Sequence, residues 1–424
     1  MNDTIFAVSS GAPPSAIAIV RISGTGADTA LDALTTIALP EPRCAALRTL
    51  RARDTDLDSA LVIRFPGPAS ATGEDVVELH LHGGRATIAA VTSALAEFRG
   101  LRAAEPGEFT RRAFENGRMD LTEVEGLSDL LRAETEHQRR SALTNASGGF
   151  SRIIDELRRE ILAASAKVEA AIDFADEDEV RPWPERASEL FSLGQRIELL
   201  LAEPPAERLR DGVRVAIAGP PNVGKSTLLN ALVARDAAIV SSIAGTTRDV
   251  VEVPVALHGL PLIFVDTAGL RDNTDDEIEA IGIARAKAII NSSDLILWLG
   301  SHSDTPERSG VIAVRTKADL IDAADDPRLA VSGVTGKGMS VLVSAIVEAA
   351  KNLLPGVDAV ALNARHRNCL LQLTSEIFDA ARADDLLLTA EHLRLARSAL
   401  DHVAGRSGVE DMLDALFGTF CIGK

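Results

Sequence analysis

The chain has 424 residues, of which 46% are hydrophobic and 25% charged, a composition typical of globular domains, and its length favours two or three of them. Its net charge of −18 argues against a protein that coats nucleic acid by itself, because phosphate contacts need clusters of Lys and Arg. The three cysteines have neither disulfide nor metal spacing, and we recognise no signal peptide or membrane-length apolar run, so we expect a cytoplasmic protein without a membrane span.

The first 115 residues predict a mixed α/β unit. Apolar runs at 16–22 and 61–65 are typical of strands, and residues 75–82 alternate between apolar and polar side chains. Two glycines follow, and residues 85–98 carry the pattern of an amphipathic helix.

Three polar residues, Glu78, His80 and His82, share one face of the strand at 75–82. Two imidazoles on one strand face suggest a metal site. A polar strand face that lines a cleft or an interface explains the same pattern, and no third convincing ligand follows in the sequence. Both interpretations stay open here.

From residue 121 the pattern becomes helical. One apolar stripe covers 121–131 and a longer one covers 153–172, with a break at 145–149. An acidic block and two prolines end the long helix, and a further helix is expected to run to about residue 201.

Residues 211–350 alternate between strand and helix, as in an α/β nucleotide-binding domain, and helical stripes return from residue 363. The predicted strands are 213–218, 251–257, 262–266, 294–299, 311–315 and 330–331. We therefore predict an α/β plus all-α chain, in which a Ras-like P-loop G domain is inserted into a helical domain. The predicted boundaries are 1–117 for the N-terminal domain, 118–210 and 353–424 for the two parts of the helical domain, and 211–352 for the G domain.

Residues 219–226 read GPPNVGKS, a G-x-x-x-x-G-K-[ST] loop between an apolar run and a helical pattern. The two glycines let several backbone N–H groups point at one phosphate, and the following helix adds its positive dipole end. Lys225 supplies a charge to the β- and γ-phosphates, and the Ser226 hydroxyl is placed to hold Mg²⁺.

Three further motifs follow in the order expected for GTP. The D-T-A-G sequence at 266–269 follows a strand, and Thr246 and Thr247 lie between it and the phosphate loop. At 316–319 the chain reads TKAD, where the Asp319 carboxylate can accept both N–H groups of the guanine edge. Ser332, Gly333 and Val334 stand where a backbone N–H would meet the guanine O6.

Two departures from the common GTPase pattern change the expectations. Thr316 replaces the Asn that braces the base and the phosphate loop, so we expect guanine specificity with lowered affinity. Leu270 replaces the Gln that orients the attacking water in many small GTPases. The acidic run at 272–279 is the candidate replacement, and either Arg248 or a monovalent cation held near Asn222 is the candidate positive charge.

Motifs spread over the whole length resemble one family. They are IVRISG at 19–24, TGEDVVE at 72–78, HGG at 82–84, PGEFTRRAF at 106–114, NGR at 116–118, PNVGKS at 221–226, IAGTTRD at 243–249, DTAGLR at 266–271, IG at 281–282 and CIGK at 421–424. This combination resembles the bacterial and organellar tRNA-modification GTPases called MnmE or TrmE.

The resemblance implies an N-terminal domain that binds a 5-formyl-tetrahydrofolate-type donor and forms a homodimer. The matching folate positions are Arg21, Glu78, Arg118 and Lys424. The resemblance also implies a heterotetramer with an FAD-dependent partner, MnmG (GidA), which together with this family modifies carbon 5 of the tRNA wobble uridine. Cys421 is a candidate catalytic residue, with a packing role as the alternative.

The resemblance further implies that a K⁺ ion replaces the arginine finger when two G domains pair. The implied K⁺ ligands are Asn222, Ser241, Ile243 and Thr246, and Mg²⁺ falls to Ser226 and Thr247. Glu279 matches the residue that orients the attacking water. The nucleotide-contacting set is Asn222, Val223, Gly224, Lys225, Ser226, Thr227, Ser241, Ser242, Ile243, Ala244, Gly245, Thr246, Thr247, Asp266, Thr267, Ala268, Gly269, Thr316, Lys317, Asp319, Ser332, Gly333 and Val334.

A second hypothesis from another class is a GTP-switched assembly or binding factor, for example in ribosome maturation, that binds no folate. The set formed by Arg21, Glu78, Arg118 and Lys424 discriminates between the two, because a generic assembly GTPase has no need of it.

Overall fold

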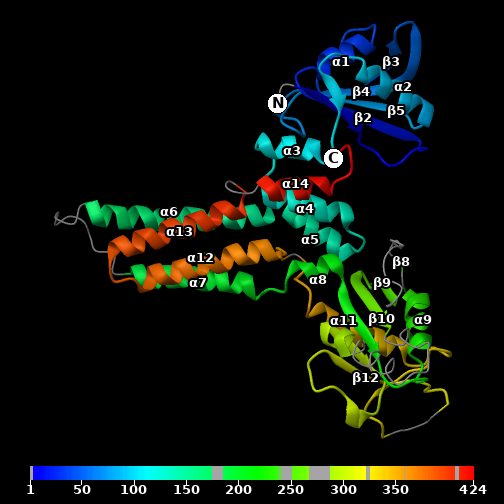
Figure 1. The fold of residues 1–424 in the computed structure, drawn as a ribbon, viewed down its shortest axis with the longest axis vertical. Coiled ribbons are helices and arrows are strands. Elements are labelled where there is room, and N and C mark those ends of the chain that lie inside the picture. The colour runs from blue at the N-terminus through cyan, green and yellow to red at the C-terminus, as the bar shows by residue number, and fades with distance from the viewer. Residues whose placement is uncertain are drawn as a thin grey trace, which may run out of the picture. The chain divides into compact units, whose positions relative to one another are not determined.

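The computed structural model describes residues 3–173, 185–236, 238–239, 251–266, 287–320, 325–357, 359–405 and 410–424 (Figure 1). The chain forms two compact units. The first combines Met1–Ser128 with Ala404–Lys424, and the second is Asp129–Val403.

The first unit is built on a six-stranded sheet of order β3-β4-β5-β2-β1-β6. All neighbours are antiparallel except β1 and β6. The strands are β1 (Thr4–Val8), β2 (Ile17–Ser23), β3 (Ala46–Ala52), β4 (Thr55–Phe65), β5 (Val76–His82) and β6 (Leu101–Ala103). Helices α1 (Ala27–Leu34) and α2 (Arg85–Ala96) bury their apolar faces against this sheet.

Short helices complete the first unit: α3 (Glu108–Glu115), the start of α4 (Leu121–Arg132) and α14 (Glu410–Gly418). Phe417 and Phe420 pack with Val124, which joins the C-terminal segment to α4. Arg112 on α3 is only 3% exposed and forms ion pairs with Asp3, Glu74 and Glu108. A buried cation therefore fastens α3 to the start of the chain and to the β4–β5 connection.

The second unit contains a seven-stranded sheet of order β13-β12-β11-β7-β10-β9-β8. Its strands are β7 (Val213–Ala218), β8 (Ala238–Ile239), β9 (Val251–Leu257), β10 (Leu260–Asp266), β11 (Leu295–Trp298), β12 (Val311–Arg315) and β13 (Leu329–Ala330). The central strand β7 is parallel to β10 and β11. Its core is shared with helices α8 (Ala206–Asp211), α9 (Lys225–Asp236) and α11 (Met339–Lys351).

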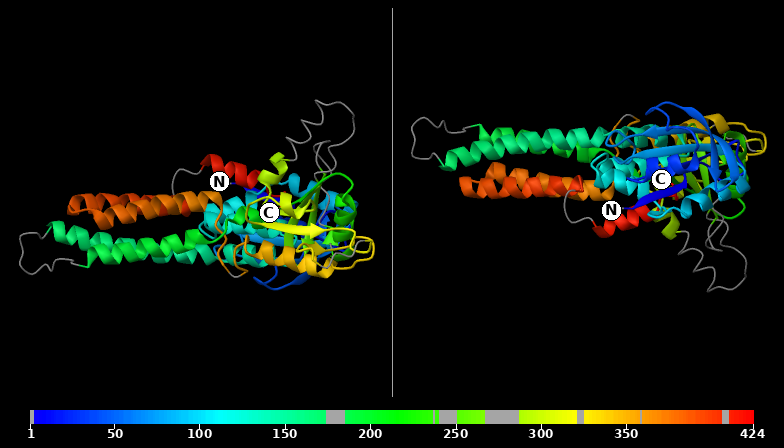
Figure 2. Two further views of the ribbon diagram at one scale, coloured as in Figure 1. Left: turned by 90° about the horizontal axis from the view of Figure 1, so that it is seen from below. Right: turned by 90° about the horizontal axis from the view of Figure 1, so that it is seen from above.

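Four long helices of the second unit share a separate apolar core and run side by side (Figure 2). They are α6 (Gly149–Asp173), α7 (Arg186–Ala202), α12 (Ala364–Arg382) and α13 (Leu386–Val403). Helix α5 (Glu136–Ala146) precedes α6 and begins with a capping box formed by Thr135 and Gln138. In sequence, the residues of the seven-stranded sheet lie between α7 and α12.

Most predicted elements are present, with boundaries shifted by a few residues. The sequence interpretation missed several elements, most of them short or fully buried: β1, β3, β6, β8, α1, α3, α5, α8 and α14. Strand β1 gave no alternating signal because Thr4, Ile5, Phe6 and Ala7 are all buried. Strand β4 begins at Thr55 and not at residue 61, since its first half is a polar hairpin arm.

Candidate nucleotide site

The phosphate loop connects β7 to α9 at the carboxyl edge of the sheet. Its backbone takes positive φ at Gly219 (+151°), Asn222 (+57°) and Gly224 (+101°). A Cβ atom added to Gly219 would lie 3.0 Å from the backbone carbon of Leu299, so a side chain there would force two loops apart. The glycine spacing of the motif is therefore required by the packing of the loop itself.

Lys225, the first residue of α9, turns its side chain back into this loop. Its ammonium group donates hydrogen bonds to the carbonyl oxygens of Gly219 (3.0 Å) and Pro220 (2.8 Å). The residue is only 8% exposed. The charge is thus fixed inside the ring of backbone groups that the sequence assigns to the phosphates.

Ser226, in the first turn of α9, and Asp266, the last residue of β10, meet at the same edge of the sheet. The Ser226 hydroxyl donates to the Asp266 carboxylate at 2.9 Å, and Asp266 is 6% exposed. This meeting follows from the topology, because β7 and β10 are parallel neighbours and both end here. A hydroxyl and a carboxylate in contact are oxygen ligands of the type that Mg²⁺ prefers, so the residues present fit the ion.

The loop that carries the T-K-A-D motif is hydrogen-bonded to the phosphate loop. The Thr316 hydroxyl donates to the carbonyl oxygen of Val223 at 2.5 Å, and the Lys317 ammonium donates to that of Asn222 at 3.0 Å. Thr316 therefore braces the phosphate loop in spite of replacing Asn. The two loops form one site.

Asp319 faces the segment at 332–334. A hydrogen bond with Ser332, together with the charge of Lys337, lowers the pKa of the Asp319 carboxyl group below its ordinary value. Ser332 is buried, and a Cβ atom added to Gly333 would lie 3.1 Å from the carbonyl oxygen of Thr227. Asp319 is thus held as an exposed, ionised acceptor beside the phosphate-loop helix.

A second set of predicted site residues lies in the first unit. Arg21 on β2 pairs with Glu78 on β5, with its Nη2 atom 2.9 Å from the Glu78 Oε1 atom. The Arg21 guanidinium also lies 5.7 Å from the centre of the Phe109 ring. His80 lies 3.4 Å from Glu78, which leaves one charged cluster on this face of the sheet.

The other two predicted folate residues lie elsewhere in this unit. Arg118 contacts the turn at Gly73, where an added Cβ atom would lie 3.2 Å from its Cγ atom. Among the described residues, no hydrogen bond or ion pair joins Arg118 or Lys424 to the Arg21–Glu78 pair. The structure therefore brings together two of the four residues directly.

The C-terminal tail is held within the first unit by contacts with its N-terminal residues. Ile422 forms a β-bridge with Pro106, and Gly423 lies so close to the Val8 carbonyl oxygen that no side chain would fit. Cys421 is exposed. A cavity of about 390 Å³ opens beside the tail, lined by Phe6, Ala7, Val8, Ser10, Gly11, Ala12, Pro13, Thr92, Ala103 and Ile422.

Comparison with known proteins agrees with this arrangement. The family model for the MnmE helical domain matches residues 121–421, and that for the GTP-binding protein TrmE N-terminus matches residues 4–118. The tRNA modification GTPase MnmE of Erythrobacter litoralis is 53% identical over the full length of both chains. That of Novosphingobium aromaticivorans is 52% identical, also over the full length of both.

The chain belongs to the MnmE (TrmE) family of tRNA modification GTPases. The MnmE of Zymomonas mobilis is 47% identical over 99% of this chain and all of its own. Among solved structures, the G domain of the T. maritima FeoB iron transporter is 27% identical over 32% of this chain and 98% of its own, with a TM-score of 0.23.

Several residues assigned from the MnmE resemblance lie outside the described residues. They are Ser241, Ser242, Ile243, Ala244, Gly245, Thr246, Thr247, Thr267, Ala268, Gly269 and Glu279, together with Leu270 and the alternative cation Arg248. Of the K⁺ ligand set, only Asn222 is described. Its side chain is exposed at the rim of the phosphate loop.

The metal interpretation of the strand at 75–82 gains no support. The described residues contain no cluster of three or more His, Cys, Asp or Glu side chains that could hold a metal ion. His82 instead pairs with Asp58 at 2.7 Å, while His80 faces Glu78.

No helix in the described residues is long and apolar enough to cross a membrane.

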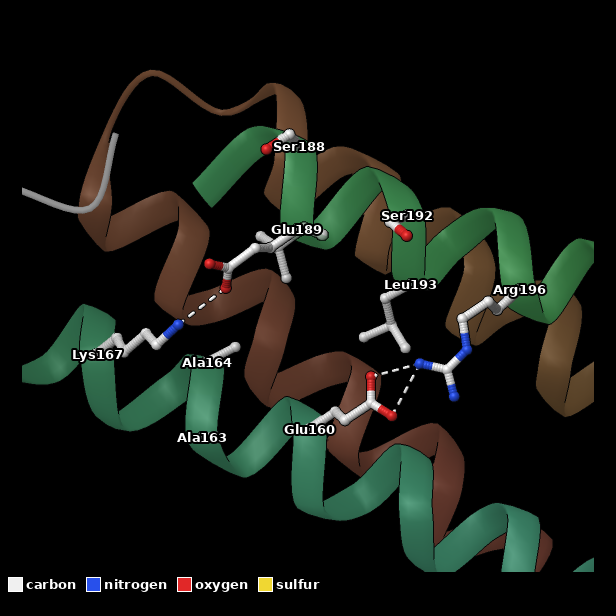
Figure 3. Close-up of a pocket in the computed structure, with 10 residues that line it drawn as sticks. Glu160, Ala163, Ala164, Lys167, Ser188, Glu189, Ser192, Leu193 and Arg196 are labelled. Atoms are coloured by element: carbon white, nitrogen blue, oxygen red, sulfur yellow. Dashed lines mark hydrogen bonds and ion pairs between the residues drawn. The ribbon is translucent and has the colours of Figure 1, made fainter. Parts of the chain in front are cut away.

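A second cavity, of about 470 Å³, lies between α6 and α7 of the MnmE helical bundle (Figure 3). Two ion pairs cross it, between Lys167 and Glu189 and between Arg196 and Glu160, both at 2.8 Å. None of the site residues predicted from the sequence lines this cavity.

The sequence interpretation missed residues that hold the nucleotide-site loops. Arg328 pairs with Asp326 and donates to the carbonyl oxygen of Gly300 at 2.6 Å, which connects the segment after β12 to the segment after β11. Lys337 donates to the carbonyl oxygen of Ala318 at 3.4 Å. The sequence offered one signal for Lys337, which is a Lys five residues after Ser332 in a Gly-rich loop.

Proposed function

We propose that this chain hydrolyses GTP and, with an FAD-dependent MnmG partner, modifies carbon 5 of the tRNA wobble uridine with a folate one-carbon donor. The observation that carries the proposal is the union of the phosphate loop and the guanine-reading loop through Thr316 and Lys317, in a chain that is similar to MnmE over its full length. The domain boundaries at 117, 210 and 352, with the G domain inserted into the helical domain, belong to this proposal.

The residues of the site divide the work of hydrolysis. The phosphate-loop backbone and Lys225 bind and orient the β- and γ-phosphates, while Asp319 selects guanine. Ser226 and Thr247 would hold Mg²⁺ with Asp266 behind them, and the bound ion neutralises phosphate charge. Glu279 orients the attacking water, since Leu270 has no polar group for this role.

The same proposal assigns the positive charge at the transition state to K⁺. Asn222 with Ser241, Ile243 and Thr246 would hold the ion once two G domains of a homodimer pair. The G-domain cycle would then serve the tRNA reaction in the cytoplasm.

The folate part of the proposal places the donor in the N-terminal domain. Its glutamate carboxylates suit Arg or Lys partners such as Arg118 and Lys424, and the paired Arg21 and Glu78 offer a donor and an acceptor for the pterin edge. Cys421 has no disulfide partner and is exposed, so a substrate can reach its thiol, and the proposal gives it a catalytic role.

GTP hydrolysis in KCl and in NaCl at equal ionic strength tests the G-domain part. We expect strong stimulation by K⁺ and its loss in Asn222→Ala. Because Asn222 has a φ of +57°, where Ala is strained, GDP affinity of the variant must be measured in parallel. Equal rates in both salts with normal GDP binding would rule out the cation mechanism and favour Arg248 or a partner's arginine.

Equilibrium dialysis with 5-formyl-tetrahydrofolate tests the N-terminal part. Wild-type protein should bind, and Arg21→Ala should bind much more weakly. Arg51→Ala is the matched control, because Arg51 lies in the same sheet and forms an exposed ion pair with Asp56. A wild type that hydrolyses GTP and binds no folate would support the assembly-factor alternative.

A further inference from the structure

Helix α5 contacts three separate parts of the G-domain sheet and its flanking segments, all within the second unit. We infer that the N-terminal end of α5, with Asn145 further along the helix, is the joint through which the nucleotide site acts on the helical bundle. His137, Gln138 and Asn145 are its positioning residues. This inference rests on the proposed nucleotide site.

The first contact is with the β9–β10 hairpin. The two strands pair without interruption from Leu260 and Leu257 at the turn to Asp266 and Val251 at the other end. Strand β10 therefore runs from the turn to the carboxylate that bonds Ser226, a span of roughly 20 Å for seven residues. Strand β9 begins directly after the segment that contains Thr246 and Thr247. A continuous hairpin thus leads from the proposed nucleotide site to the turn at residues 258–259.

The turn of this hairpin meets the start of α5. His258 and Gly259 both have positive φ, and the carbonyl oxygen of Gly259 accepts a hydrogen bond from the His137 backbone N–H at 3.4 Å. A Cβ atom added to Gly259 would lie 3.9 Å from the Cβ atom of Glu136. A shift of the hairpin along its axis would therefore act directly on the first turn of α5.

The second contact is with the segment that leads into the G-domain sheet. The Gln138 side-chain amide donates to the carbonyl oxygens of Leu209 (3.0 Å) and Arg210 (3.2 Å), just before β7. Its other atom, Oε1, accepts from the backbone N–H of Thr135 in the capping box. One side chain thus links the cap of α5 to the start of the central strand.

The third contact is with the segment that follows α11. The His137 Nε2–H group donates to the carbonyl oxygen of Pro355 at 2.9 Å, and the Asn145 amide donates to that of Ala361 at 3.0 Å. The two residues are eight positions apart, so they lie on one face of α5. This face of α5 therefore binds the segment after α11 at two points, Pro355 and Ala361.

Two acceptors on this face have no hydrogen-bond partner among the described residues: His137 Nδ1 and Asn145 Oδ1. Both residues are only 7% exposed. A buried acceptor without a partner costs free energy, and a second arrangement of the segment that satisfies these atoms would recover it. Such a gain is the differential contact that a two-state joint would need. Helix α6 starts only three residues after α5 ends, so a change there reaches the bundle.

Hydrogen exchange on the full chain, with GDP and with a non-hydrolysable GTP analogue, tests the joint. We expect the backbone amides of α5 and of residues 356–362 to exchange at different rates in the two states. Gln138→Glu should abolish this difference. A carboxylate at this position keeps the capping-box acceptor and loses the N–H donor, so the helix start is preserved. Asn145→Leu, which removes the contact to Ala361, is the second variant.

Thr144→Ala is the matched control, since among the described residues the Thr144 hydroxyl bonds within its own helix, to the Arg140 carbonyl oxygen. Nucleotide affinity and the basal GTPase rate should be unchanged in all three variants. A wild type that binds both nucleotides without any difference at α5 and 356–362 would overturn the joint. So would a difference that survives in both Gln138→Glu and Asn145→Leu. Absence of nucleotide binding in the wild type would instead overturn the nucleotide site, and the joint with it.

Discussion

The Thr316 hydroxyl donates a hydrogen bond to the carbonyl oxygen of Val223 at 2.5 Å, which ties the loop that carries the T-K-A-D motif to the phosphate loop. An Asn at this position can reach the same carbonyl with a longer side chain. The shorter Thr makes the contact because the two loops lie close together here, and the neighbouring Lys317 ammonium also bonds to the Asn222 carbonyl oxygen.

Thr316→Val removes this hydrogen bond and keeps the shape of the side chain. Loss of one such bond costs about 1 kcal/mol, so we expect GDP affinity to fall roughly fivefold. Thr316→Ser, which keeps the hydroxyl, is the matched control. Titration with a fluorescent GDP analogue measures the affinity of both variants. Equal GDP affinities of Thr316→Val and the wild type would show that the hydrogen bond does not contribute.

Asp319→Asn should weaken GTP binding and improve the relative affinity for XTP. The guanine edge donates two N–H groups to a carboxylate, whereas xanthine carries an oxygen in place of the amino group and can accept from an amide. The Ser226–Asp266 pair is untouched, so Mg²⁺ dependence should be unchanged. Competition between GTP and XTP measures the effect, and an unaltered preference would place guanine recognition elsewhere.

Glu279→Ala should lower the GTPase rate without weakening nucleotide binding, since the residue is assigned to the attacking water and not to the nucleotide. Single-turnover hydrolysis and GDP titration separate the two effects. A larger loss of rate in Asp276→Ala or Glu277→Ala would show that the role belongs to another residue of the acidic run.

The stability of the second unit should fall as the pH drops through His137's titration range. Burial lowers the pKa of His137 below its ordinary value of 6.5, against the opposing effect of its hydrogen bond to Pro355, and the nearby Arg140 adds to the lowering. The unfolded chain therefore binds more protons, so this contribution is present above pH 6.5 and is lost as the pH falls toward the folded pKa.

Urea unfolding at pH 7.5 and 5.5 measures this contribution. His137→Gln removes the titrating group and retains an amide donor for the Pro355 carbonyl oxygen. The change in unfolding free energy between the two pH values should be smaller in the variant. An equal change in both proteins would assign the pH dependence to other groups.

The sequence alone was sufficient where chemistry depends on local spacing. The phosphate loop, the strands that precede Asp266 and Thr316, and the helical stripes all follow from periodicity and motif within a short window, and the strand predicted at 311–315 is confirmed to the residue. Strand β1 and the short helices α3 and α14 were missed because full burial or short length removes the periodic signal.

Only the tertiary structure decided which distant residues meet. Ser226 and Asp266 are 40 positions apart and touch because β7 and β10 are parallel neighbours. Thr316 reaches Val223 across 93 positions, which no spacing rule could predict for a side chain that departs from the family pattern. The α5 joint depends on backbone carbonyls at 209, 259, 355 and 361, and backbone acceptors leave no mark in a sequence because every residue carries one.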